Sequence, residues 1–385
     1  MTQIPAGWEE TTLQLCTLPV QEKISLTQVS EDNYISTENM LPNIWWVVIS
    51  SGLPNINSIT KFQKWDILFS NIRTYFRKLW YATFTGGVSN DVLVFRGNYS
   101  KIYSKFLFYR LSDNSFFDYT IKTSKWTKMP RWDKEAIWNF PIHLPPLPEQ
   151  QAIAAVLSSF DDKIELLRAE NETLEQMGQE LFKERFGKWK VGDELPEGWR
   201  VGKLGEIWIQ ITQKVKEDSG RVVLSAVNTG NLVLSEEYFS KQVYSNSISK
   251  YIVCNKWDFA YNPARINIWS IWRNSYWNGA VSPVYVVFRP KEGFGRFLEY
   301  IFKSRKFNDH VAKYSNWSVR QALNYDWFSR FELIIPWNDI LVKFNNTLQV
   351  FEKKIKRNLE QIQSLSATRD QLLPKLMSWE MRVEF

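Results

Sequence analysis

The sequence predicts an α+β fold: two tandem α/β domains related by internal duplication, each followed by a long helix, with the two helices pairing as an antiparallel coiled coil. Three observations lead to this prediction. Short motifs from the first half of the 385-residue chain return in the same order in the second half. Two segments carry apolar residues at heptad spacing, and the 44% hydrophobic share is ample for packed cores.

The duplication is visible in a series of paired motifs. A Pro-x-Gly-Trp motif opens each half, a Lys-Trp-Asp motif follows, and a Gly-x-Val-Ser motif leads to Val-Phe-Arg. The copies are Pro5–Trp8 and Pro196–Trp199, Lys64–Asp66 and Lys256–Asp258, Gly86–Ser89 and Gly279–Ser282, Val94–Arg96 and Val287–Arg289, Trp126 and Trp317, and Pro145 and Pro336. Because the spacing between copies is nearly constant, the halves represent one repeated unit.

Each half has the same internal order. A mixed stretch rich in β-branched and aromatic residues comes first, in which Tyr99–Leu111 and Val281–Phe288 are predicted to be strands or buried apolar segments. A Pro-rich exit then ends the globular part and starts a long helix. We therefore expect domains at residues 1–148 and 188–336, and helices at 149–187 and 337–385.

The two helices have the clearest local pattern. Their apolar residues recur at alternating steps of four and three, which is the repeat of a coiled coil. These residues are Ile153, Leu157, Phe160, Ile164, Leu167, Leu174 and Leu181 in the first helix, and Phe344, Leu348, Phe351, Ile355, Ile362, Leu365, Leu372 and Leu376 in the second. The alternative is two ordinary amphipathic helices, each lying on its own domain.

Asn171 and Asn358 each occupy a core position of this heptad pattern. Antiparallel helices with matched ends would bring the two amides face to face, whereas parallel helices would set each amide against an apolar side chain. A buried Asn pair fixes the register of a coiled coil at some cost in stability. We therefore expect Asn171 and Asn358 to be in contact.

The composition argues against several kinds of catalytic site. Cys16 and Cys254 are too few for a disulfide framework or a Cys-rich metal site, and His143 and His310 stand alone. Asn262-Pro263 lacks the second proline and the aromatic residue of the adenine-methyltransferase motif. We find no glycine-rich cofactor turn and no phosphate loop. The chain is therefore expected to be non-catalytic and to hold no metal.

The net charge of +7 fits a polyanionic partner, although many other proteins are equally basic. The N-terminal residues lack the pattern of a secretion signal, and no apolar run approaches the roughly 18 residues of a membrane span. Together with the low Cys count, these features predict a cytoplasmic protein.

A combination of motifs links the sequence to one family. The motifs are the exit Leu144-Pro145-Pro146-Leu147-Pro148-Glu149-Gln150-Gln151 with the helix after it, the two Pro-x-Gly-Trp starts, and the terminal Leu372-Leu373-Pro374-Lys375-Leu376-Met377-Ser378. With these motifs the sequence resembles the DNA-specificity subunit of a type I restriction–modification enzyme, over essentially the whole chain.

The resemblance implies a division of labour. Each globular domain would be a target-recognition domain that reads half of a bipartite double-stranded DNA site, and the coiled coil would dock two modification subunits. These methyltransferase subunits would bind S-adenosylmethionine and methylate adenine, while restriction subunits would use ATP and Mg to translocate and cut DNA. The chain itself would need no cofactor. The outer helix faces, including Glu165, Arg168, Lys356 and Arg357, are the expected partner surface, with a solvated face as the alternative.

The predicted coiled coil has a suitable length for such a site. A helix pair of about 35 residues is on the order of 50 Å long. One turn of B-DNA measures roughly 34 Å, so each domain could meet its own stretch of major groove. Helix length would then set the spacer between the half-sites.

Candidate DNA contacts lie in equivalent loops of the two halves. Arg and Lys bind guanine edges and phosphates, Asn and Gln pair with adenine, and small hydroxyl side chains contact the DNA backbone. The candidates are Arg73, Arg77, Lys78, Asn262, Arg265 and Asn267 after the Lys-Trp-Asp motifs, and Thr127, Lys128, Arg131, Ser318, Arg320 and Gln321 in later loops. A solvated strand end is the alternative for each residue.

Two other functions stay open at this point. A single-chain DNA methyltransferase or nuclease with divergent motifs would act without partner subunits. A stand-alone DNA-binding protein would lack modification partners altogether.

Glycine and tryptophan occur at unusual frequencies. The chain has 16 Gly and 19 Trp, whereas a Gly frequency of about 7% would give roughly 27. Several tryptophans stand in turns and loops where glycine is usual. They are Trp65, Trp126, Trp132, Trp257, Trp269, Trp272, Trp317 and Trp379. A gene whose cell reads UGA as glycine, translated with a code that reads UGA as tryptophan, would show Trp at such positions. We expect a subset of these tryptophans to be glycines of this kind; an unusually Trp-rich protein, whose indoles pack or stack on DNA, is the alternative.

Overall fold

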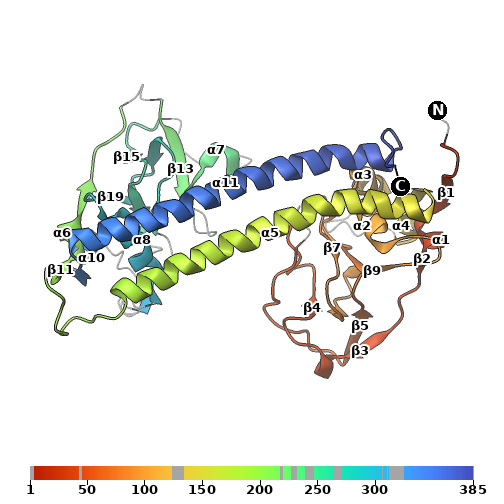
Figure 1. Cartoon of the computed structure of the whole chain (residues 1–385), viewed down its shortest axis with the longest axis horizontal. Coiled ribbons are helices and arrows are strands. Elements are labelled where there is room, and N and C mark those ends of the chain that lie inside the picture. Colours follow the sequence, from red (N-terminus) through yellow and green to blue (C-terminus); the bar gives the residue numbers. More distant parts are fainter. Residues whose placement is uncertain are drawn as a thin grey trace. The chain divides into compact units, whose positions relative to one another are not determined.

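The chain forms two compact units, each combining a globular domain with parts of two long helices. The computed structural model describes residues 4–42, 46–123, 134–216, 220–226, 232–238, 247–263, 271–305, 307–309, 311 and 325–384. The first unit is Met1–Arg168 with Leu359–Phe385, and the second is Ala169–Asn358. The long helices are α5 (Leu147–Phe186) and α11 (Asn338–Met377), each one continuous ribbon in Figure 1. The predicted α+β fold class is confirmed.

The described residues of the first unit form two four-stranded sheets and one strand pair. The sheet orders are β2-β9-β6-β7 and β3-β5-β8-β4, and β1 pairs with β10. The strands are β1 Glu9–Thr12, β2 Thr17–Leu18, β3 Lys23–Ser25, β4 Tyr34–Ile35, β5 Ser58–Phe62, β6 Ile67–Ser70, β7 Leu79–Tyr81, β8 Gly86–Val88, β9 Val92–Gly97 and β10 Pro141–Leu144. The helices are α1 Leu13–Cys16, α2 Ser104–Ser112, α3 Asn114–Thr123 and α4 Lys134–Trp138, with 3-10 turns η1 Leu26–Gln28 and η2 Thr74–Phe76.

Strand β6 shows how the first unit is layered. Successive side chains of a strand point to opposite faces of a sheet. Ile67 and Phe69 pack into the core formed with α2 and α3, whereas Leu68 packs into a separate core with Phe62 and Val88 of the other sheet. The uninterrupted apolar run Ile67–Phe69 is therefore buried on both faces.

The second unit repeats most of this plan. Its strands are β11 Arg200–Lys203, β12 Trp208–Ile211, β13 Val222–Ala226, β14 Leu232–Leu234, β15 Ile252–Asn255, β16 Phe259–Tyr261, β17 Ile271–Arg273, β18 Asn278–Val281, β19 Val286–Pro290 and β20 Glu332–Ile335. Its described helices are α6 Leu204–Ile207, α7 Ser235–Tyr238, α8 Phe294–Lys303 and α10 Tyr325–Ser329. The sheet β12-β19-β16-β17 has the order of β2-β9-β6-β7, and β11–β20 repeats β1–β10.

The second sheets of the two units differ. In both, a parallel pair forms around the Gly-x-Val strand, as β4–β8 and β13–β18. The two units differ in their fourth strand. In the first unit this strand is β3, which pairs with β5, whereas in the second unit it is β14, which pairs with β13. The duplication is therefore closest in the sheet beside the helices and weakest in the outer sheet.

The Pro-rich exit of the first unit is held by buried hydrogen bonds. Trp8 Nε1 donates to Glu149 Oε2 at 3.1 Å, and Arg382 donates to both oxygens of the same carboxylate. Gln150 accepts from the Tyr103 amide and donates to the carbonyls of Lys101 and Pro145. Buried polar groups need such partners, so these contacts explain why the exit carries Glu-Gln after its prolines.

Tyr99–Leu111 forms mostly helix. The segment was predicted to be a strand or a buried apolar segment; residues from Ser104 onward form α2, and nearly all of that helix is buried. Val281–Phe288 includes the start of β19, as a strand prediction requires. None of the described helices is both long enough and apolar enough to cross a bilayer.

Candidate nucleic-acid interface

The two long helices contact each other in antiparallel register. In the second unit, Asn358 Nδ2 donates to Asn171 Oδ1 at 2.8 Å and to Glu170 Oε2 at 2.9 Å. In the first unit, Ile164, Leu167 and Ile362 form a small buried cluster. The contact expected for antiparallel helices with matched ends is therefore present.

At the helix ends, the residues of the coiled-coil pattern are shared with the domain cores. Ile153 and Leu157 lie in the core of the first domain together with Leu376, and Leu348 lies in the core of the second domain. The helices still contact each other there, since the ring centres of Phe186 of α5 and Phe344 of α11 lie 5.0 Å apart. The two alternatives from the sequence therefore hold together at the helix ends, and the paired-helix alternative alone holds in the middle. The reason is that one apolar stripe serves both the partner helix and the domain beneath it.

Each domain is fastened to its long helix by an acidic residue at an equivalent position. In the first unit, Asp161 of α5 accepts from Tyr109 Oη at 2.5 Å and from Arg369 at 2.6 Å. In the second, Glu352 of α11 accepts from Arg296 of α8 through two bonds of 2.9 and 2.7 Å. Charge-assisted, two-point bonds of this kind fix orientation as well as distance.

The Lys-Trp-Asp motif and the later Arg form one structural device. Arg96 donates two bonds of 2.8 Å to Asp66, and Arg289 donates bonds of 2.7 and 2.9 Å to Asp258. Both aspartates are buried, and hydrogen bonding to Asp66 raises the pKa of Arg96. The pair joins the turn before β6 or β16 to strand β9 or β19. The repeat therefore preserves an ion pair whose structural role the sequence alone did not reveal.

The candidate residues after the first motif have different environments. Arg73 is exposed. The Arg77 guanidinium lies 4.6 Å from the ring centre of Phe117, and Lys78 Nζ donates to the Thr37 carbonyl at 2.5 Å. Arg77 and Lys78 therefore brace the loop in the free chain, and their contact with DNA stays a prediction.

One further candidate lies among the described residues. Asn262 follows β16 and is half-buried. The residues Thr127, Lys128, Arg131, Arg265, Asn267, Ser318, Arg320 and Gln321 lie outside the described residues. On the expected partner surface, Glu165, Lys356 and Arg357 are exposed, but Arg168 is half-buried with its guanidinium 5.1 Å from the Trp46 ring centre.

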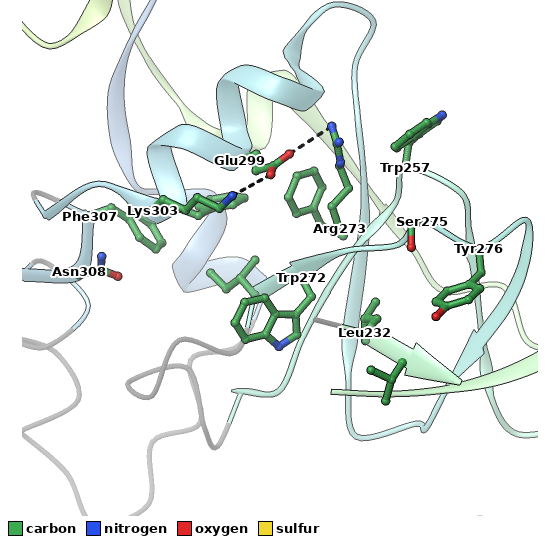
Figure 2. A pocket seen from close by; sticks show the side chains of 14 residues that line it. Leu232, Trp257, Trp272, Arg273, Ser275, Tyr276, Glu299, Lys303, Phe307 and Asn308 are labelled. Carbon is green, nitrogen blue, oxygen red and sulfur yellow. Dashed lines mark hydrogen bonds and ion pairs between the residues drawn. The ribbon is translucent and has the colours of Figure 1, made fainter. Parts of the chain in front are cut away.

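A cavity of about 450 Å³ lies beside α8 and β17 in the second domain (Figure 2). Glu299 reaches from α8 between Arg273 and Lys303, at 3.2 and 2.9 Å. Burial alone would raise the pKa of Glu299, but the two cations outweigh burial and hold that pKa below its usual range. The charges of the cavity wall are thus matched to one another, which fits a structural ion-pair network.

Neither cysteine is an activated nucleophile. Both cysteines are buried, and burial raises the pKa of each thiol, so neither is a reactive thiolate near neutral pH. No group of three or more His, Cys, Asp or Glu residues in the described ranges is arranged to hold a metal ion.

The chain resembles proteins of known class in sequence. The family described as "Type I restriction modification DNA specificity domain" matches residues 7–176. The type I restriction enzyme MjaIX specificity subunit of Methanocaldococcus jannaschii is 26% identical over 317 residues, covering 74% of this chain and 70% of that protein. The EcoDI specificity subunit of Escherichia coli is 29% identical over 176 residues, covering 41% of this chain and 39% of that protein.

Solved structures agree in fold. The type I restriction–modification S subunit from M. genitalium has a TM-score of 0.55 at 14% identity, covering 100% of this chain and 98% of that one. A chain from a structural study of complex assembly and conformational transition in a type I restriction–modification system has a TM-score of 0.50 at 17% identity, covering 98% and 99%. In sequence over most of its length, and in fold, the chain is similar to DNA-specificity subunits of type I restriction–modification enzymes.

Proposed function

We propose that this chain is the specificity subunit that directs a type I restriction–modification complex to a bipartite DNA target. Its two target-recognition domains each read one half-site, and the paired helices carry two modification subunits. The observation that carries this proposal is the duplication itself: one domain fold occurs twice, and in each unit the long helix is bound to its domain through Asp161 or Glu352.

The chemistry then belongs to partner subunits. Modification subunits supply S-adenosylmethionine and methylate adenine, and restriction subunits supply ATP- and Mg-dependent translocation and cleavage. Supporting this assignment, the buried thiols and the matched charges of the Figure 2 cavity provide no group for methyl transfer or strand cleavage. The exposed Glu165, Lys356 and Arg357 belong to the helix faces available to the modification subunits.

The decisive experiment is methylome sequencing in a heterologous host. The gene, synthesised with codons that the host reads as the intended residues, is expressed alone and together with a modification-subunit gene from the same source. A third culture expresses only the modification-subunit gene. We expect one bipartite adenine-methylated motif, only when both genes are present. Methylation by this chain alone would favour the single-chain methyltransferase, and DNA binding without any association with a modification subunit would favour the stand-alone DNA-binding protein.

A further inference from the structure

The loop that joins β6 to β7, Asn71–Lys78, has two residues in the left-handed backbone conformation, and neither of them is glycine. Arg73 and Arg77 have φ angles of 49° and 52°. Such left-handed values strain a residue that carries a Cβ, and this strain concentrates at functional loops.

Both ends of the loop are anchored, so the strain is not relieved. The Asn71 amide donates to the Asp91 carbonyl at 2.7 Å. At the other end, Arg77 lies over Phe117 and Lys78 is bonded to the Thr37 carbonyl. The anchored loop holds the residues between its ends in one conformation.

The anchored loop presents Arg73 and Tyr75 to solvent. Tyr75 is 57% exposed, with its ring centre 4.6 Å from that of Phe76. Arg73 is exposed, and no salt bridge to it is found among the described residues. Burial, and then the charge of Arg73, lowers the pKa of Lys78, so two cations repel each other here. A phosphate group would relieve that repulsion.

We propose that Arg73 and Tyr75 are the residues with which this loop reads DNA. Arg73 binds a phosphate or a guanine edge, and Tyr75 stacks on a base or sugar. The assignment rests on the proposed function and adds Tyr75, whose type and position gave no signal in the sequence.

The test measures binding of a duplex carrying the methylated motif to the complex of this chain with its modification subunits. Tyr75→Ala should weaken binding about 10- to 100-fold, the usual loss when a stacked aromatic is removed. Tyr99→Ala is the matched control, because Tyr99 is also 57% exposed but lies in the turn after β9. It should leave binding unchanged.

Arg73→Gly separates function from structure. Glycine accepts the left-handed φ, so the melting temperature should rise while DNA affinity falls about tenfold or more. Unchanged affinity in both Tyr75→Ala and Arg73→Gly, in a complex whose wild type binds bipartite DNA, would overturn the loop assignment alone. A wild-type complex without bipartite preference would instead overturn the proposed function.

A second inference comes from four turns of the same geometry. In each, the amide of the fourth residue donates to the carbonyl of the first at 3.0–3.1 Å, and the third residue has a φ of 74–87°. These third residues are Gly7, Gly198, Trp65 and Trp257. A turn whose third residue needs positive φ takes glycine or asparagine there, because a Cβ is strained.

The indoles of Trp65 and Trp257 do little to offset that strain. They are 51% and 49% exposed, and the ring contacts found for them are with Lys64 for Trp65, and with Lys256 and Arg273 for Trp257. Trp379, the second residue after α11, also has a positive φ, 57°, where a left-handed glycine commonly ends a helix. Its indole, in contrast to the other two, lies against the rings of Trp8 and His143. Trp272 lies in β17 without positive φ, and Trp126, Trp132, Trp269 and Trp317 lie outside the described residues.

We infer that Trp65 and Trp257 are glycines in the natural polypeptide, encoded by UGA codons that the source cell reads as glycine. The gene should carry UGA at positions 65 and 257 and UGG at the buried Trp8 and Trp199. Peptide mass spectrometry of the chain from its source cell should then find glycine. UGG codons or tryptophan-containing peptides at positions 65 and 257 would overturn the inference.

A stability measurement tests the physical cause directly. In the recombinant chain, Trp65→Gly and Trp257→Gly should each raise the melting temperature by about 2–4 °C, because the strained Cβ is removed. The controls Trp8→Gly and Trp199→Gly should lower it, because both indoles are buried. Lower melting temperatures for the first pair of variants would contradict the strain.

Discussion

Asn358 Nδ2 donates to Asn171 Oδ1 at 2.8 Å, so the two long helices meet amide to amide within the second unit. Asn358 is almost fully buried, and its second acceptor is Glu170. Sliding one helix along the other would leave this amide against apolar side chains, which costs the desolvation of an unpaired polar group. The pair therefore selects one alignment of α5 and α11.

Replacing one member of this pair should destabilise the chain. Asn358→Leu leaves the Asn171 amide without its partner, and we expect a loss of about 1–2 kcal/mol in the free energy of unfolding by urea. Asn171→Leu should cost less, because Asn358 keeps Glu170. The double variant should regain stability while losing register specificity.

Asn346→Leu is the control, because Asn346 is exposed on α11. It should change the unfolding free energy by less than about 0.5 kcal/mol. Equal effects of Asn358→Leu and Asn346→Leu would contradict a register role for the pair.

The sequence predicted the duplication and the helix pairing because both depend on local patterns that survive in a single chain. Paired motifs such as Lys-Trp-Asp persist because Asp66 and Asp258 must each meet a distant Arg. The different outer strands, β3 and β14, could not be predicted. Their placement depends on which sheet edge is free, and no residue pattern records that.

The two copies of the Asp–Arg pair should contribute differently to the free energy of unfolding. Arg96 is 12% exposed and Arg289 is 46% exposed, while both aspartates are buried. Arg96→Ala leaves the carboxylate of Asp66 buried without its partner, and should lower the free energy of unfolding by about 3 kcal/mol. Arg289→Ala should cost about 1 kcal/mol, because water can replace its guanidinium. Calorimetric or urea unfolding of the two variants gives the comparison, and equal losses would contradict it.

The carboxylate of Glu299 predicts a pH dependence. Arg273 and Lys303 overcome burial and hold its pKa below the ordinary value, so the folded state binds that proton more weakly than the unfolded state. The ionised Glu299 therefore makes its full contribution to the free energy of unfolding above the ordinary Glu pKa. This contribution disappears as the pH falls through the lowered pKa of the folded state.

Glu299→Gln should lower the free energy of unfolding by about 1–2 kcal/mol at pH 7. The difference from wild type should shrink steadily as the pH falls below about 4.3. Urea titrations at several pH values provide the measurement. Glu180→Gln, on the exposed face of α5, should show no such trend. A difference that grows toward low pH would refute the assignment.

The candidate DNA contacts were less predictable than the fold. Arg73, Arg77 and Lys78 are alike in sequence, yet Arg77 covers a Phe ring, Lys78 binds a carbonyl and Arg73 faces solvent. A cation in a loop has the same signature whether it braces that loop or faces a ligand. Only the packing around Phe117 and Thr37 separates the two roles.

The length of the paired helices should set the spacing of the two half-sites. Removing the heptad Asp162–Arg168 from α5 and the facing heptad Gln361–Ala367 from α11 keeps the Asp161–Arg369 and Arg296–Glu352 attachments. Seven residues of helix rise about 10 Å, close to three base pairs of B-DNA. Methylome sequencing of the shortened chain with its modification subunits should therefore show the same half-sites with a spacer about three base pairs shorter.

Removing a heptad from one helix alone is the control for this design. Asn171 and Asn358 both remain, but the two helices then differ in length by one heptad. Either the Asn pair or the Asp161–Arg369 contact is therefore lost, and the chain should lose stability rather than change its spacer. A paired deletion that methylates the original spacer with unchanged efficiency would show that something other than helix length determines the distance. Since methylation would be as efficient as in the wild type, damage to either domain could not explain such a result.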